Sequence, residues 1–228
     1  MHSSVLVFVD EGITSLEQIM RCYDETTEES DLLKFEQHIA KKDINKEYKK
    51  ALKPSKWRDN LNGWKEAKQL SPKTFFEGSE GYVSDENGNL GYRRNPNGKY
   101  DWYECGGRWA HTLIDKKEGK CSRVRLKNID LEAMKNDVIE YYGNLYDKQK
   151  NNRNEFIIHP TNIVDQLTKE EYIEKNNKGL RTFFLNLVDE EQWIELDGLS
   201  DEEANDTIFA FINSHHPNTM VYVVDIHY

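Results

Sequence analysis

The densest group of side chains capable of chemistry lies in residues 99–109, with the sequence KYDWYECGGRW. Gly106 and Gly107 allow a close approach of the backbone, and the Arg108 guanidinium can stack on an aromatic ring while it donates several hydrogen bonds. Such a segment suits a flat base, a phosphate or a carboxylate. Tryptophan and tyrosine are also common core residues, so a packed structural segment in which Asp101 simply holds Arg108 is the alternative.

Two further polar residues lie near the end of the chain. Asp225 and His227 stand at positions i and i+2 of an apolar run, so they project from one face of a strand. If the first and last strands share a sheet, these side chains converge with the aromatic segment; the alternative is an ordinary exposed chain end. The predicted ligand-binding residues are Tyr23, Asp24, Asp101, Trp102, Tyr103, Glu104, Gly106, Gly107, Arg108, Trp109, Asp225 and His227.

No established catalytic, metal or cofactor motif is recognisable. The histidines lack HxxxH or HxH spacing, and the loop 85–89 lacks the final glutamate of a calcium-binding loop. The glycines form neither a phosphate-binding loop nor a dinucleotide fingerprint. We therefore predict no metal, no cofactor and no assigned catalytic residue, and we expect a binding protein more than an enzyme.

Residues 99–109 resemble a K-W-D-W-Y-x-x-G-G-R-W signature found in small, poorly characterised proteins of bacteriophages and prophages. Two shorter segments accompany it: residues 23–26, YDET, are similar to a Y-D-E-N stretch, and residues 224–227, VDIH, are similar to a V-D-x-H ending. Tyr100 replaces the usual tryptophan of the signature, and Thr26 replaces the usual asparagine. The matches cover about a tenth of the chain. The resemblance implies an accessory protein of phage origin and no settled activity.

Composition restricts the class and the compartment. The chain has 228 residues, with 31 Lys and Arg against 41 Asp and Glu, a net charge of −10 and a pI of about 5.3. An acidic surface repels phosphate backbones, so nucleic acid is not an expected partner. There is no apolar run long enough for a membrane helix and no feature of a signal peptide. The three cysteines share no ligand spacing, which favours reduced thiols in the host cell cytoplasm.

The apolar pattern predicts an α+β fold. Strands are expected at 4–9, in the aromatic segment, at 181–188 and at 220–227, with helices near 14–22 and 201–214 on one face of the sheet. This β-α-β-β-α-β order predicts a ferredoxin-like core. We expect a single domain over 1–228 with three additions: a helical insertion or lid at 28–72, an aromatic and glycine-rich hairpin segment at 74–126, and a helical insertion at 131–175.

Three functions compete at this point. The first is a phage-encoded counter-defence protein that binds and sequesters a small nucleotide-type signal, because aromatic faces stack bases and Arg108 meets phosphates. The second is an acidic protein inhibitor of a host defence protein or nuclease, with the acidic stretches 24–31 and 189–206 as its surfaces. The third is a nucleotide-processing enzyme that uses Asp101, Glu104, Asp225 and His227. The oligomeric state is not predicted.

Overall fold

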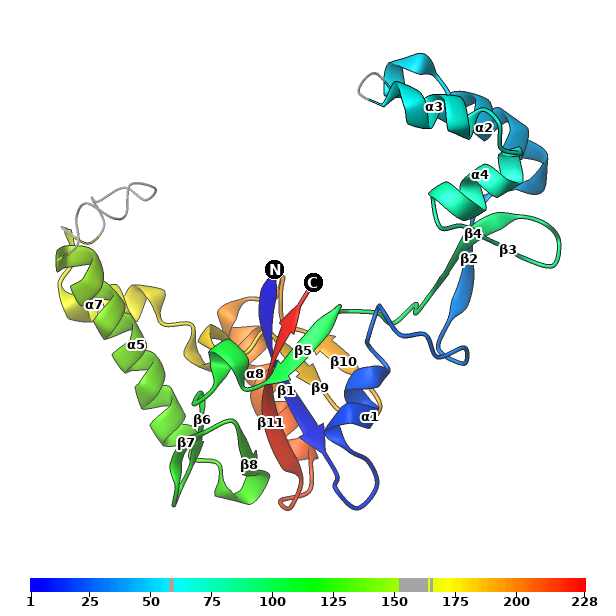
Figure 1. The fold of residues 1–228 in the computed structure, drawn as a ribbon. Helices are drawn as coiled ribbons and strands as arrows, with labels where there is room; N and C mark the ends of the chain where they lie inside the picture. The colour runs from blue at the N-terminus through cyan, green and yellow to red at the C-terminus, as the bar shows by residue number, and fades with distance from the viewer. Residues whose placement is uncertain (58–59, 152–163, 165) are drawn as a thin grey trace. The chain divides into compact units, whose positions relative to one another are not determined.

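The structure is a computed structural model that describes residues 1–57, 60–151, 164 and 166–228. Where the sequence predicts one domain, the chain forms two compact units (Figure 1). Unit 1 comprises Met1–Arg21 and Tyr100–Tyr228, and unit 2 comprises Cys22–Lys99. Unit 2 is therefore a single insertion in the sequence of unit 1, and it contains the whole predicted insertion 28–72.

Unit 1 contains a six-stranded sheet with the order β10-β9-β1-β11-β5, in which β8 also pairs with β11. Its central strands β1 and β11 run antiparallel over their full lengths, whereas β1 and β9 run parallel. The strands of this sheet are β1 (His2–Val9), β5 (Trp102–Cys105), β8 (Arg123–Arg125), β9 (Asn186–Val188), β10 (Trp193–Glu195) and β11 (Met220–His227). The α+β class is thus confirmed, as is a shared sheet for the first, last and aromatic strands.

The pairing differs from the predicted ferredoxin-like core. In that arrangement every neighbouring strand is antiparallel, and the second and fourth strands lie at opposite edges of the sheet. Here β1 and β9 are parallel, and β5 lies directly beside β11. The position next to β9 at the edge of the sheet is occupied by β10, for which the sequence pattern predicts no strand. The Asp189 carboxylate accepts hydrogen bonds from the backbone N–H groups of Glu191 and Gln192 and so closes the turn between β9 and β10.

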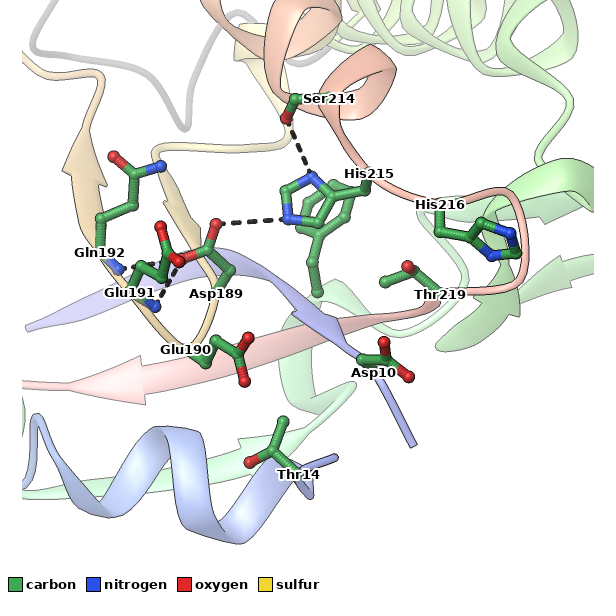
Figure 2. A pocket seen from close by; sticks show the side chains of 11 residues that line it. Asp10, Thr14, Asp189, Glu190, Glu191, Gln192, Ser214, His215, His216 and Thr219 are labelled. Carbon is green, nitrogen blue, oxygen red and sulfur yellow. Dashed lines mark hydrogen bonds and ion pairs between the residues drawn. The ribbon is translucent and has the colours of Figure 1, made fainter. Parts of the chain in front are cut away.

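The main core of unit 1 lies on the sheet face that carries Leu6 and Phe8. Helix α8 packs there, with the rings of Phe8 and Phe211 5.0 Å apart. Val5 and Val7 alternate with these residues and are equally buried on the other face. Helix α1 lies on that second side (Figure 2), so the prediction that both helices share a face is wrong. The helices of unit 1 whose bounds fall within the described residues are α1 (Leu16–Arg21), α5 (Leu131–Asn151), α7 (Lys169–Asn176) and α8 (Asp201–Ser214).

Several local predictions hold in unit 1 and others fail. The helix predicted near 201–214 is α8, and Ser200 and Glu203 form a capping box at its start. The predicted strand 181–188 is a strand only at its end, because Gly179–Thr182 forms a 3₁₀ turn. In the predicted helical insertion over 131–175, residues 152–163 and 165 lie outside the described residues, and α7 begins after the capping residue Thr168. A separate hairpin pairs β6 (Leu113–Asp115) with β7 (Gly119–Cys121).

Over its described residues, unit 2 combines a three-stranded sheet with the helices α2, α3 and α4 (Figure 1). Its elements are β2 (Lys34–Ile39), α2 (Ile44–Ala51), α3 (Leu61–Ala67), α4 (Pro72–Ser79), β3 (Val83–Ser84) and β4 (Leu90–Arg94). The predicted helical insertion over 28–72 is wrong at β2, since residues 34–39 pair with β4. The start of the predicted hairpin segment is instead α4, which the Ser71 hydroxyl caps. Helices and sheet enclose a small core around Phe75 and Leu90.

Candidate functional site

The register of three strands collects polar side chains on one face of the unit 1 sheet. Directly opposed residues form two rows across β1, β11 and β5. Because side chains alternate along a strand, both rows lie on the face that carries Leu6 and Phe8 further along β1. We call this patch the polar face. Its rows are His2, His227 and Trp102, and then Ser4, Asp225 and Glu104.

Asp225 is the buried anchor of the polar face, with 1% of its surface exposed. Its Oδ1 lies 3.0 Å from His2 Nδ1, and its Oδ2 accepts a hydrogen bond of 3.0 Å from the backbone N–H of Arg108. Gly107 has a positive φ of 49°, and a Cβ there would lie 2.5 Å from the Asp225 Cβ. The absence of side chains at Gly106 and Gly107 therefore lets the backbone pack closely on other parts of the protein. Gly107 packs on Asp225, and Gly106 packs on Ser122.

A second carboxylate orients the other imidazole. His227 Nδ1 lies 2.8 and 3.0 Å from the two carboxylate oxygens of Asp101. This hydrogen bond holds the pKa of Asp101 below its usual value. The indole of Trp102 lies parallel to the His227 ring, with centroids 5.9 Å apart, and 43% of Trp102 is exposed. The His2 ring meets the His227 ring edge-on at 5.1 Å.

The two histidines share one arrangement with a chemical consequence. Each presents Nδ1 to a carboxylate, and no other described residue pairs with either Nε2 atom. A carboxylate at Nδ1 fixes the orientation of an imidazole and the tautomer it adopts. The Nε2 atoms of His2 and His227 are therefore left to bind a ligand or to exchange a proton with one.

Arg108 and Trp109 behave differently from the prediction. Asp101 is engaged with His227, and the exposed Arg108 side chain makes no ion pair with any residue that the structure describes. The expectation that Asp101 holds Arg108 is therefore wrong; the backbone of Arg108, in the 3₁₀ turn Gly107–Trp109, contacts Asp225 instead. Trp109 is half-buried against the core, and its buried Nε1 has no hydrogen-bond partner within the described part of the chain.

The structure does not assign every predicted site residue to the polar face. Tyr103 alternates with Trp102 and pairs with Ile226, so it points to the opposite side of the sheet. Tyr23 and Asp24 belong to unit 2, where the Tyr23 carbonyl accepts a hydrogen bond from the Lys99 N–H. The Asp24 carboxylate accepts hydrogen bonds from the N–H and hydroxyl of Thr26 and so stabilises a local turn.

His2 and Ser4 also belong to the polar face, although neither is among the residues predicted from the sequence. Ser4 is fully buried beside Asp225, and its Oγ has no hydrogen-bond partner among the described residues. The only signal is the antiparallel register, which places a residue near the N-terminus opposite His227. That register follows from pairing between the two ends of the chain, so no local pattern reveals it.

A pocket of about 390 Å³ lies at the other end of β1 (Figure 2). Asp10 and Asp189 line it because each follows one of the parallel neighbours β1 and β9. His215 Nε2 lies 3.3 Å from Asp189 Oδ2, and His215 Nδ1 lies 2.7 Å from the Phe211 carbonyl oxygen. Four carboxylates line the pocket, those of Asp10, Asp189, Glu190 and Glu191. This charge disfavours an anionic ligand there.

Across the described residues, no group of three or more His, Cys, Asp or Glu side chains has the geometry to hold a metal ion. Nor does any described helix combine the length and apolar character needed to cross a bilayer. Comparison of the chain with protein-family models, with curated proteins and with solved structures gives no match.

Proposed function

We propose that the polar face of unit 1 binds a small anionic ligand that carries a planar ring, of the nucleotide type. The observation that carries this proposal is the pairing of two carboxylate-oriented imidazoles with an exposed, stacked indole. An indole face stacks any base, and a guanidinium donates to phosphate oxygens. An imidazole whose Nδ1 proton faces a carboxylate donates from Nε2 to a phosphate oxygen when the ring is protonated. Arg108 supports the proposal because its side chain is exposed and makes no ion pair with the described residues.

The biological use that we propose is sequestration of a nucleotide-type signal of bacterial defence by a phage-encoded protein in the host cytoplasm. The support for this step is the similarity of residues 99–109 to the phage signature. The structure adds that the most distinctive residues of this segment contact Asp225, which belongs to the second similar segment, 224–227. Two segments far apart in the sequence thus pack against each other at the polar face.

Trp102→Ala is expected to weaken nucleotide binding by about 1–3 kcal/mol, or roughly 5- to 150-fold, because it removes the stacking face. The fold should persist, since Trp102 is 43% exposed and lies on an edge strand. Isothermal titration calorimetry with a panel of mono- and dinucleotides measures the first effect and thermal melting the second. Tyr141→Ala, at an aromatic 47% exposed on α5, is the matched control. A Trp102→Ala variant that binds as tightly as the wild type refutes the stacking role.

Arg108→Lys separates a ligand contact from a structural one. Lysine keeps the charge but loses the planar two-pronged geometry, so ligand binding should fall by about 1.5–3 kcal/mol. The melting temperature should not change, because the contact to Asp225 uses the backbone N–H that lysine retains. A lower melting temperature, with no nucleotide bound by the wild type, contradicts the proposed role of Arg108.

A nucleotide-processing enzyme is the second candidate, and the paired Nε2 atoms are the observation that favours it. Two imidazoles with rings 5.1 Å apart can act as general base and general acid on one phosphate ester. Native mass spectrometry of protein purified from cells, before and after incubation with nucleotides, distinguishes the candidates. An unchanged bound nucleotide supports sequestration, a converted nucleotide supports an enzyme, and a co-purified host protein supports the acidic inhibitor.

A further inference from the structure

The charge of the chain is distributed very unevenly. Residues 41–73, which we call the basic segment, contain 11 Lys and Arg against 4 Asp and Glu. The remaining residues contain 20 Lys and Arg against 37 Asp and Glu. The net charge of −10 therefore conceals a segment with a surplus of seven positive charges. An expectation about partners drawn from the average charge does not apply to this segment.

The lysines of the basic segment are all on the surface of unit 2. They lie on or next to α2 and α3, on or next to the 3₁₀ turns Lys41–Asp43 and Pro54–Lys56, and at the start of α4 (Figure 1). Among the described residues, two of them pair with carboxylates, namely Lys50 with Glu47 at 2.6 Å and Lys73 with Glu77 at 3.6 Å. The ten exposed lysines are Lys41, Lys42, Lys46, Lys49, Lys50, Lys53, Lys56, Lys65, Lys68 and Lys73.

Several of these amines gather around one carboxylate. The hydrogen bond from Lys50 lowers the pKa of Glu47, and the charges of Lys50, Lys46 and Lys56 lower it further. Residues from α2 and from the following 3₁₀ turn thus contribute to one positive area. A single glutamate cannot neutralise three ammonium groups, so the area keeps a positive potential.

The apolar side chains of the basic segment are engaged inside unit 2. The indole N–H groups of Trp57 and Trp64 donate to the carbonyl oxygens of Ala51 and Leu52, each at 2.9 Å. Tyr48 donates its hydroxyl to the Ala67 carbonyl oxygen and packs on the core of the unit. A protein partner would need exposed aromatic or arginine anchors, and a membrane surface would need an exposed apolar helix face.

The described part of the basic segment offers neither kind of contact. Leu70, 38% exposed, is the single large apolar side chain on the surface of that part, and one such residue is ordinary for a surface. Lysine ammonium groups remain as the groups that can meet a partner. They are point charges that contact phosphates without a fixed geometry, which suits a nucleic-acid backbone and not the reading of bases.

We propose that the basic segment of unit 2 binds nucleic acid through its phosphate backbone, without sequence preference. This inference goes beyond the proposed function, because it concerns other residues in the other unit and stands if the polar face binds nothing. The affinity for nucleic acid should then depend strongly on salt concentration. Each neutralised phosphate of a duplex contributes about −0.9 to the slope of log K against log salt concentration.

The test compares two triple variants with the same change in net charge. The first carries Lys46→Gln, Lys49→Gln and Lys53→Gln, which remove three exposed amines in or next to α2 that form no ion pair with a described residue. The matched control carries Lys117→Gln, Lys175→Gln and Lys178→Gln, at exposed positions of unit 1. Fluorescence anisotropy with a labelled DNA duplex of about 24 base pairs, between roughly 50 and 200 mM salt, gives the affinity and the salt slope.

We expect the wild type and the control to bind the duplex alike. The basic-segment variant should bind at least about tenfold more weakly at low salt, with a slope shallower by about one for each phosphate that it no longer neutralises. Circular dichroism melts should show equal folding of all three proteins. The proposal is overturned if the wild type does not bind the duplex at low salt, or if both variants fall equally in affinity. Equal or tighter binding to polyglutamate or to phosphatidylserine vesicles overturns it as well.

Discussion

Gly107→Ala is expected to lower the free energy of unfolding by about 3–4 kcal/mol. A left-handed φ of 49° costs an alanine about 1–2 kcal/mol. The added Cβ would also lie 2.5 Å from the Asp225 Cβ and 2.7 Å from its Oδ2, which is far inside contact distance. The backbone must move away, and the hydrogen bond from the Arg108 N–H to the buried carboxylate then breaks, at a cost of about 1–3 kcal/mol. Urea unfolding measures the sum.

Gly119→Ala is the control for this substitution. Gly119 also has a positive φ, of 81°, but a Cβ there would meet no atom within 4 Å. It should therefore cost only the conformational part, about 1–2 kcal/mol. If Gly107→Ala is no more destabilising than Gly119→Ala, the close packing of Gly107 on Asp225 does not contribute to stability and the explanation for the glycine is wrong.

Asp225→Ala is expected to lower the free energy of unfolding by about 3 kcal/mol. The substitution leaves the Arg108 N–H without an acceptor and removes the partner of His2 Nδ1, both near a buried position. An orphaned buried donor costs about 1–3 kcal/mol, and the cavity left by the side chain adds to this. The same variant should lose nucleotide binding, because the His2 ring is no longer oriented.

Asp225→Asn separates these two effects. Its amide oxygen can still accept from the Arg108 N–H, while its NH₂ group faces His2 Nδ1 and favours the tautomer that carries its proton on Nε2. We expect most of the stability to return and ligand affinity to change. Asp101→Ala, at a half-exposed carboxylate, should leave the free energy of unfolding nearly unchanged. If the Ala variant at position 225 is as stable as the wild type, the carboxylate is not a structural anchor.

The elements that the sequence determined are those with strong local signals. The β-branched run of β1 needs burial on both faces, and the Ser200 capping box starts α8 wherever the helix packs. By contrast, β2 carries charged and polar residues that suit a helix equally well. Only its pairing with β4, more than fifty residues later, makes it a strand, because backbone hydrogen bonds across that distance depend on the tertiary fold.

The candidate site shows the same division. The sequence alone identified Trp102, Arg108, Asp225 and His227 as residues with chemistry, from their types and from the i, i+2 spacing on the last strand. The tertiary structure decided which groups meet, since the register of β1 on β11 brings His2 and Ser4 to the patch, and pairing with β5 turns Tyr103 away from it. Register is set by side-chain packing along whole strands, and a shift of one residue would reverse every face. The local sequence does not specify the register of the strands, so the partners of Asp225 could be known only from the folded chain.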